Sequence, residues 1–352
     1  MNNQFLKACR REKVDYTPVW LMRQAGRYMK EYQEIRKKYS FLTMCKTPEL
    51  AAEITLQPVR KLGVDAAIIF ADILLPLEGM GIKLEFADNE GPVICNPVRN
   101  RSDVESLHLI EPEKDVPFVL DAIKNSRREL NGSIPLIGFS GAPFTLASYI
   151  IEGGYSRNFI HTKSIMYNDP SSWQTLMDKI TKVVISYLKA QIYAGAQAIQ
   201  LFDSWVGCLS PEDYKNYVAP YSKEVIDTLK SAISKENLPN SIPVIHFGTD
   251  SSNILELMKN TGGDVIGIDW RIELDAAWKR LGYDVAIQGN LDPAVLFATK
   301  DKIEKSVRDI LLKAGGRPGH IFNLGHGILP KTPIDNVITL VQAVHNYSKK
   351  II

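Results

Sequence analysis

Two arginines lie four residues apart in MRQAGRYMKEY (22–32), directly after the apolar run TPVWLM (17–22). A guanidinium group stays protonated at any working pH and can hold a carboxylate through two parallel hydrogen bonds. On a helical turn Arg23 and Arg27 would share one face, so both could contact one ligand. The segment predicts a pocket for an anion with several carboxylates. The alternative is two surface arginines paired with Glu31 or Glu34.

Further polar side chains directly follow apolar runs later in the chain. They are Asp72 in FADIL, Ser140 with Gly141, Asp203 with Ser204, His246, Asp269, Asn290, and His326 in NLGHG. In a parallel barrel the carboxyl ends of the strands form the active site, so we expect these residues at one mouth. The alternative for each is a structural role, such as capping a helix or packing in the barrel.

Two of these residues have environments that the sequence indicates. Asp72 has apolar neighbours, and burial would raise its pKa above the reference value of about 3.9. It is a candidate general acid or base, or a fixed negative charge facing a cation; a helix N-cap is the alternative. His326 lies between two glycines, which would let the backbone approach a ligand closely. A loop histidine is its alternative.

The sequence shows no pattern typical of a metal site. Its four cysteines, at positions 9, 45, 95 and 208, form no CxxC pair, and His246 has no Cys or His two or four residues later. Neither a Ser-His-Asp motif nor a P-loop is found. Scattered cysteines and an N-terminus without an apolar signal segment favour a reducing, cytoplasmic location.

Short apolar runs separated by helical segments must position these residues. Eight runs without strict alternation predict strands buried on both faces: TPVWLM (17–22), AAIIF (66–70), IPLIGF (134–139), AIQLF (198–202), PVIHF (243–247), VIGID (265–269), VAIQG (285–289) and HIFNL (320–324). Helices are expected to begin at Thr47-Pro48, Ser210-Pro211, Asp292-Pro293 and Thr332-Pro333 and to end at Gly63, Gly195, Gly262, Gly282 and Gly315.

This alternation predicts a single-domain (β/α)8 TIM barrel over 1–352. A doubly wound sheet is the rival, but RQAGRY is not its Gly-rich phosphate motif. An early β-hairpin insertion is expected at 82–95, around an Asp-Asn-Glu-Gly turn. The uncharged stretch 131–151 is long enough to span a membrane, but its prolines and glycines favour a strand, a tight loop and a helix start. A net charge of +2 without basic tracts argues against a nucleic-acid partner.

Six motifs, in this order, resemble those of the uroporphyrinogen decarboxylase family: MRQAGRY, FADIL, FSGAPFTLASYIIEGG, GAQAIQLFDSW, QGNLDP and NLGHG. The resemblance runs from about residue 3 to about residue 346. It implies a (β/α)8 barrel, usually a homodimer, that removes CO2 from the four acetate side chains of uroporphyrinogen III to give coproporphyrinogen III in haem synthesis. It also implies that neither a metal nor an organic cofactor takes part.

The resemblance assigns roles to individual residues. The run Arg23-Gln24-Ala25-Gly26-Arg27 corresponds to the family's substrate-binding segment, in which the two arginines bind carboxylates. Asp72 corresponds to the aspartate that accepts hydrogen bonds from the pyrrole N–H groups, and Tyr149, Ser204 and His326 correspond to further substrate contacts. We expect Asp72, Arg23, Arg27 and Tyr149 to take part in catalysis. A zinc-dependent methyltransferase on a related barrel and a non-catalytic tetrapyrrole binder are the alternatives.

Overall fold

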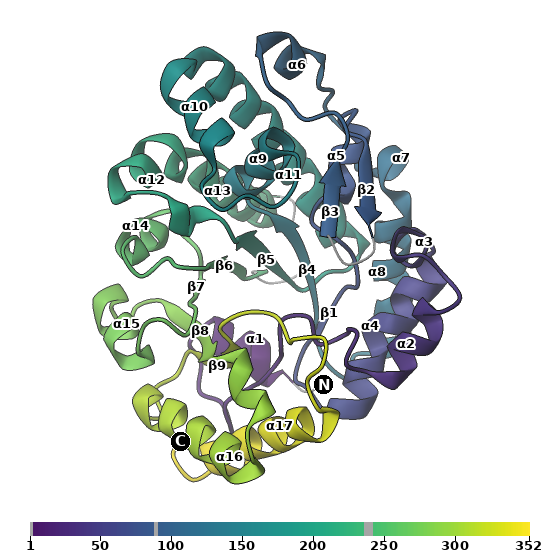
Figure 1. The fold of residues 1–352 in the computed structure, drawn as a ribbon. Coiled ribbons are helices and arrows are strands. Elements are labelled where there is room, and N and C mark those ends of the chain that lie inside the picture. Colours follow the sequence, from purple (N-terminus) through teal and green to yellow (C-terminus); the bar gives the residue numbers. More distant parts are fainter. Residues whose placement is uncertain (1–2, 88–90, 236–241) are drawn as a thin grey trace.

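A curled sheet of seven parallel strands forms the centre of the computed structural model, which describes residues 3–87, 91–235 and 242–352 (Figure 1). The strand order is β1-β4-β5-β6-β7-β8-β9. Its strands are β1 (Ala67–Ile68), β4 (Leu136–Gly141), β5 (Ala198–Asp203), β6 (Val244–Gly248), β7 (Val265–Gly267), β8 (Ala286–Leu291) and β9 (His320–Leu324). Seven of the eight predicted strands are therefore confirmed, and all of them run parallel as expected.

The run TPVWLM does not form a strand. Val19 makes an isolated parallel bridge to Phe322, the Phe322 N–H donates to the Pro18 carbonyl at 2.9 Å, and the Asp65 N–H donates to the Val19 carbonyl at 2.8 Å. Pro18 has no N–H, and the Val19 N–H donates to the Asp65 carboxylate at 2.8 Å instead of to a strand carbonyl. The segment consequently lies between β9 and the start of β1 without continuing either ladder, so the expected eighth strand is wrong.

The N-terminal helix α1 (Gln4–Cys9) packs at the amino end of the sheet. Phe5 and Ala8 are fully buried in one cluster with Trp20 and with inward-facing residues of the strands, such as Ile245 and Ile321. A short polar row crosses this interior. The Trp20 indole N–H donates to Gln288 at 2.9 Å, and the Gln288 amide donates to Gln200 at 3.0 Å.

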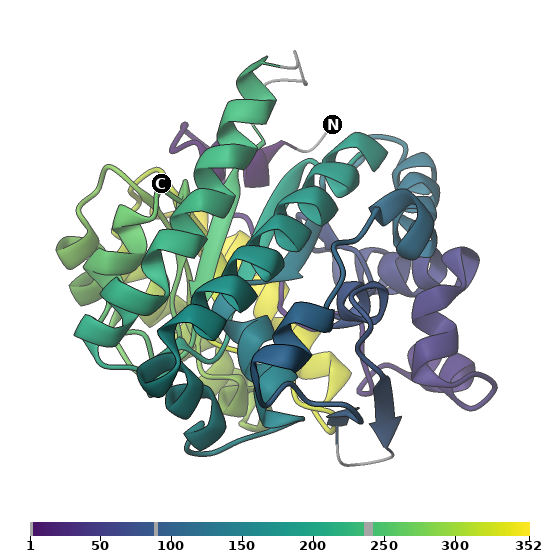
Figure 2. The ribbon, with the colours of Figure 1, turned by 90° about the horizontal axis from the view of Figure 1, so that it is seen from above.

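Helices cover the outer face of the sheet (Figures 1 and 2). In the first half they are α2 (Lys30–Arg36), α3 (Phe41–Lys46), α4 (Pro48–Leu62), α5 (Leu75–Gly79), α6 (Arg101–Ser106), α7 (Pro112–Asp115), α8 (Pro117–Leu130), α9 (Pro143–Glu152), α10 (Ile160–Asn168) and α11 (Pro170–Ala194). In the second half they are α12 (Pro211–Tyr217), α13 (Ala219–Lys235), α14 (Leu255–Asn260), α15 (Leu274–Leu281), α16 (Lys300–Ala314) and α17 (Ile334–Ser348), with the 3-10 turns η1 (Val206–Cys208) and η2 (Pro293–Phe297). Two apolar clusters join them to the sheet.

Most predicted helix boundaries are confirmed. Gly63, Gly195 and Gly315 end helices in the left-handed conformation, and the Ser210 hydroxyl accepts the Asp213 N–H. Two starts differ. Asp292-Pro293 begins the 3-10 turn η2 rather than an α-helix, and α17 begins one residue later than expected, with Pro333 as its N-cap.

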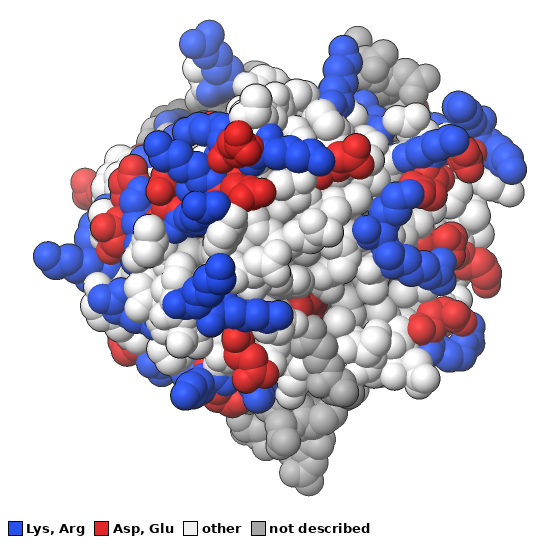
Figure 3. Space-filling view, turned by 90° about the horizontal axis from the view of Figure 1, so that it is seen from below, with Lys and Arg blue, Asp and Glu red and all other residues white. Residues whose placement is uncertain are grey.

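The hairpin insertion is confirmed by β2 (Leu84–Ala87), which pairs antiparallel with β3 (Gly91–Ile94). Of its expected turn, residues 88–90 lie outside the described part of the chain. The uncharged stretch 131–151 forms β4, a tight loop and α9, as expected. Within the described ranges, no helix has the length and apolar character to cross a bilayer. On the face shown in Figure 3, lysines and arginines lie beside aspartates and glutamates, and a broad area between them carries no charge.

Candidate active site

The segment that carries Arg23 and Arg27 is a pair of tight turns. The Gln24 N–H donates to the Leu21 carbonyl at 2.9 Å, the Met29 N–H donates to the Gly26 carbonyl at 3.0 Å, and α2 begins only at Lys30. Both arginines are exposed, and Arg23 has a φ of 59°. The expectation that they share one face of a helix is therefore wrong.

Gln24 fixes these turns from inside. Its fully buried side chain accepts the Leu21 N–H at 3.1 Å and donates to the Ala66 carbonyl at 3.1 Å, next to β1. The Tyr28 hydroxyl donates to the Gln24 carbonyl at 2.5 Å. Because the amide faces the protein interior, Gln24 holds its half-buried neighbours Ala25 and Gly26, and the arginines, in place at the end of the apolar run.

The Arg23 side chain lies over the loop that follows β9. A methyl group added at Gly327 would lie 2.4 Å from Arg23 Cδ, so the arginine stem covers this glycine. The backbone is joined at the same place, because the Ile328 N–H donates to the Met22 carbonyl at 2.9 Å and the Met22 N–H donates to Asn323 at 3.1 Å. Arg23 is thereby placed beside His326.

Asp72 follows β1 and is half-buried. One carboxylate oxygen accepts the Leu74 N–H at 2.9 Å, just before α5. Burial raises the pKa of Asp72, and the Leu74 N–H and the Arg23 charge oppose that rise because they favour the ionised form. Asp72 is thus a carboxylate that faces an arginine without forming a surface ion pair.

Tyr149 projects from α9 and is also half-buried. Burial and the neighbouring Asp72 charge raise its pKa to about 12, whereas Arg23 lowers it. The hydroxyl is consequently neutral at any physiological pH and can donate a hydrogen bond. Because Tyr149 interacts electrostatically with both Asp72 and Arg23, the three groups belong to one site.

His326 completes this cluster from the loop after β9. Burial and the charges of Arg23 and Arg271 lower the pKa of His326 to about 4, and Asp269 opposes the shift. Arg271 is fixed nearby, since it forms ion pairs with Asp269 at 2.6 Å and with Asp250 at 2.7 Å. The imidazole is therefore neutral at physiological pH.

Ser204 lies in the turn after β5, next to Trp205, which ends the motif GAQAIQLFDSW and to which the sequence assigned no role. Trp205 packs edge-on against Tyr149, with ring centroids 5.6 Å apart, and also contacts Tyr155 at 5.9 Å and Phe159 at 5.5 Å. The sequence signal was available, because Trp205 directly follows a strand-end serine.

The structure thus brings Arg23, Asp72, Tyr149 and His326 together, with Ser204 alongside through Trp205. Arg27 is placed on the same turns, but its charge acts on Tyr32 of α2. Other strand-end residues have structural contacts. The Asn290 amide donates to the carbonyls of Asp269 and Ile272.

The described side chains do not form a metal site. In the residues that the structure describes, no group of three or more His, Cys, Asp or Glu side chains could hold a metal ion. Both ring nitrogens of His246 lie against protein oxygens, at 3.1 Å from Thr261 and 3.3 Å from Asp203. The chemistry of the described donors therefore does not fit a zinc site at His246.

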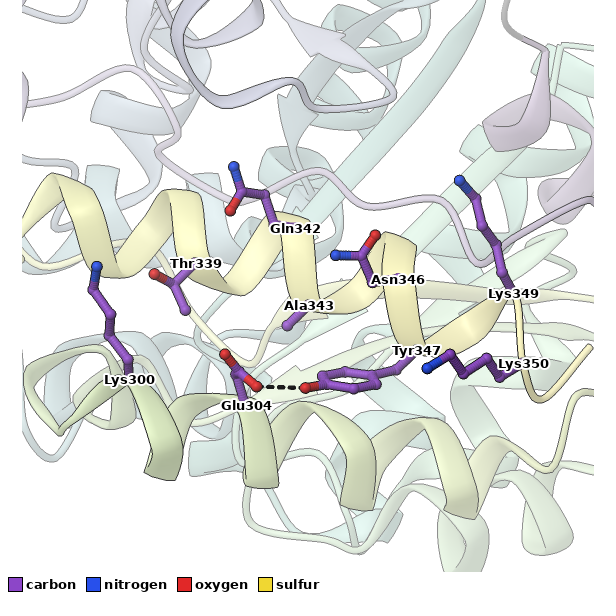
Figure 4. Close-up of a pocket in the computed structure, with 9 residues that line it drawn as sticks. All are labelled: Lys300, Glu304, Thr339, Gln342, Ala343, Asn346, Tyr347, Lys349 and Lys350. Atoms are coloured by element: carbon purple, nitrogen blue, oxygen red, sulfur yellow. Dashed lines mark hydrogen bonds between the residues drawn. The ribbon is translucent and has the colours of Figure 1, made fainter.

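A cavity of about 740 Å³ lies elsewhere, in the groove between α16 and α17 (Figure 4). Its polar side chains bond to one another across the helices, as the Tyr347 hydroxyl donates to Glu304. Arg308, on α16, pairs with the same two residues. The residues that line this groove belong to α16, α17 and the turn after α17, and none of the strand-end residues is among them.

A curled parallel sheet covered by helices, with ionisable side chains at the carboxyl ends of its strands, is the arrangement of barrel enzymes. The chain belongs to the uroporphyrinogen decarboxylase (URO-D) family, whose model matches residues 1–347. A uroporphyrinogen decarboxylase of Carboxydothermus hydrogenoformans is 64% identical over 99% of this chain and 97% of its own length. One of Sorangium cellulosum is 56% identical over 98% and 97%.

A solved structure of a methyltransferase from Methanosarcina mazei has the same fold. Its TM-score is 0.82 at 19% identity, over 98% of each chain. At this identity the likeness concerns the fold alone and carries no reaction over to this chain.

Proposed function

We propose that this protein is a uroporphyrinogen decarboxylase, which converts uroporphyrinogen III to coproporphyrinogen III with release of four CO2. The observation that carries the proposal is the position of Arg23. Its charge acts on Asp72, Tyr149 and His326, so a carboxylate-binding cation and three titratable groups share one strand-end site. Family membership supports the same substrate.

Substrate binding is assigned to the turns of 23–27. The substrate carries eight carboxylates on a ring of four pyrroles, and exposed guanidinium groups at a pocket rim suit it. Arg23 and Arg27 hold carboxylates, while Ala25 and Gly26 allow the ring to approach the backbone. Gln24 contributes chiefly through its backbone, because its amide is engaged with Leu21 and Ala66.

Decarboxylation of an acetate needs a sink for the electrons of the breaking C–C bond. A pyrrole protonated on carbon is an iminium-like cation and accepts them as CO2 leaves. Protonation of the exocyclic carbon and loss of the ring proton then give the methyl group. The substrate thus supplies the electron sink that pyridoxal phosphate supplies in other enzymes.

Asp72 stabilises this cation. As an ionised carboxylate it accepts hydrogen bonds from the pyrrole N–H groups and faces the positive charge as it develops. Two unit charges ~4 Å apart at an effective dielectric of about 20 interact by about 4 kcal/mol, which is a rate factor of roughly a thousand if realised only in the transition state.

Tyr149 and His326 act without net charge. With pKa values of about 12 and about 4, both are neutral at physiological pH, so they position carboxylates and pyrroles by hydrogen bonding or pass a proton through it. Ser204 adds a further polar contact. An arginine, with a water, is the candidate that relays the proton to the ring.

Three finer features belong to the same proposal. Segment 17–22 takes the place of the eighth strand, so the fold corresponds to a (β/α)8 barrel of one domain. The protein acts in the cytoplasm as a homodimer, without metal or organic cofactor. Light scattering of the purified protein at several concentrations tests the dimer, and a constant monomer mass would contradict it.

The deciding experiment is an anaerobic assay with reduced uroporphyrinogen III, comparing wild type with Asp72→Asn. Products are oxidised and separated by carboxylate number. We expect wild type to give seven- to four-carboxylate porphyrins in sequence and the variant to be about a thousand-fold slower while still binding. Asp284→Asn, at an exposed surface ion pair, is the control. If wild type binds the tetrapyrrole without releasing CO2, the protein is a non-catalytic binder.

A further inference from the structure

A buried histidine–aspartate pair lies behind the candidate site, between the sheet and its helices. Ile199 and Leu201 of β5 belong to the helix-facing cluster, and Asp203 continues on that side. His246 of β6 also points outward, because its neighbours Ile245 and Phe247 face the barrel interior. Both side chains are fully buried, with His246 Nε2 3.3 Å from Asp203 Oδ2. The chemistry proposed above uses neither.

The hydrogen bonds around the pair fix its protons. Thr261 Oγ1 donates its one hydrogen to the Met258 carbonyl at 2.7 Å. It must then accept from His246 Nδ1, 3.1 Å away, so Nδ1 carries a proton. Nε2 faces a carboxylate oxygen, and a lone pair there would be repelled. A second proton therefore lies between Nε2 and Asp203 and joins the two side chains.

The other groups around Asp203 agree with this assignment. Its second oxygen, Oδ1, accepts the Thr145 hydroxyl at 3.1 Å. Burial, together with the Asp203 charge, raises the pKa of Tyr214 of α12 and of Cys208 of η1. Both groups therefore stay neutral and add no charge beside the His246–Asp203 pair.

The network continues to the turn that carries Ser204. Thr145 Oγ1, which donates to Asp203, also accepts the Trp205 N–H at 3.4 Å. From the other side the Thr249 hydroxyl donates to the Ser204 carbonyl. A methyl group at Gly207 would lie 2.2 Å from Asp250 Cβ, so segment 249–250 packs closely against this turn. Trp205 in turn packs against Tyr149.

We propose that His246 is a positioning residue for the decarboxylase reaction. Through Nε2 it anchors Asp203, which through Thr145 fixes the backbone of Trp205 and so the places of Ser204 and Tyr149 beside the substrate. The inference rests on the proposed function. It goes further by assigning a role in the reaction to a residue that does not touch the reacting atoms.

The test compares His246→Gln with His345→Gln in the anaerobic assay. His345 is a matched control, because it pairs with the buried Asp65 at 2.7 Å but on α17, away from the strand-end cluster. Both changes should lower the melting temperature. Only His246→Gln should reduce kcat/KM, by about ten-fold or more, since small displacements of positioning groups cost large rate factors. Equal kcat and KM in His246→Gln and wild type would overturn the proposal.

A measurement on wild type avoids reliance on a variant that fails to fold. In 15N-histidine NMR, one histidine should carry a proton on Nδ1 and should change its Nε2 signal in Asp203→Asn. If no histidine signal changes in Asp203→Asn, His246 does not anchor Asp203 and the proposal is wrong. An inactive wild type that still shows this response would instead overturn the proposed function and leave the buried pair in place.

Discussion

At the scale of single residues, Arg23 is the group that connects the other side chains of the site. Its charge acts on three groups from three different elements, and its stem covers Gly327. The sequence identified Arg23, Asp72 and His326 because each follows an apolar run. It could not show that Arg23 lies on a turn rather than a helix. That depends on the Gln24 amide bonding to Ala66, which is distant in the sequence.

We predict that Gly327→Ala raises KM for uroporphyrinogen by about ten-fold or more. The added methyl would lie 2.4 Å from Arg23 Cδ, so the arginine must leave its place. Steady-state kinetics in the Arg23→Ala background provides the control. If Gly327 acts through Arg23, Gly327→Ala adds nothing there. Additive losses in the double variant would show that the glycine acts in another way.

We predict that His326→Gln leaves the shape of the pH–rate profile unchanged between pH 6 and 8. Burial and two arginines lower the pKa of His326 to about 4, so the imidazole does not titrate in this range. An amide that can still donate a hydrogen bond should keep part of the rate. The measurement is kcat/KM against pH for both proteins. A limb near pH 6.5 in wild type that is lost in the variant would mean that His326 works as a titrating base.

At the scale of elements, the strands that were predicted correctly share one property. Each is a short apolar run buried on both faces, which a parallel sheet requires and which the sequence displays directly. The run TPVWLM shows the same pattern but pairs at a single bridge. Pro18 has no N–H, and the N–H groups of Val19, Leu21 and Met22 donate to side chains rather than to strand carbonyls. Side chains outside the run compete for its backbone N–H groups, and the apolar pattern of the run cannot show this competition.

Asp65 is the residue that holds this segment in place beside the sheet. Fully buried, it accepts the Tyr16 hydroxyl at 2.8 Å and the Val19 N–H at 2.8 Å, and pairs with His345 at 2.7 Å. We predict that Asp65→Ala lowers the free energy of unfolding by about 3 kcal/mol, because several buried donors lose a charged acceptor. Urea denaturation measures this. Asp284→Ala, which removes an exposed ion pair to Lys259, should change the midpoint little.

At the scale of the whole molecule, stability and chemistry occupy opposite ends of the sheet. The site residues follow the strands, whereas Asp65 and His320 stand where β1 and β9 begin. His320 is buried, donates from Nε2 to the Gly289 carbonyl at 3.1 Å, and within the described part of the chain has no partner for Nδ1. Burial lowers its pKa to about 4.

This depressed pKa makes the protein sensitive to acid. The unfolded chain has a histidine pKa of about 6.5 and binds the proton first, so the stability due to neutral His320 is complete above that pH and falls as the pH drops toward 4. At pH 5 the loss is about 2 kcal/mol. Urea unfolding at pH 7.5 and pH 5 should show His320→Gln losing about 2 kcal/mol less than wild type. Equal losses would contradict this account.

The packing of α1 and segment 18–20 also has a consequence for synthesis. These residues leave the ribosome about 300 residues before β9, yet Phe5 and Val19 find their partners in β9. Until Ile321 and Phe322 emerge, the apolar face of α1 cannot be fully buried and stays exposed to solvent. The two ends of the chain must therefore meet before the sheet can close. Such pairing of distant segments is slow and leaves apolar surface exposed to aggregation. The growing chain is therefore prone to aggregate until β9 has been made.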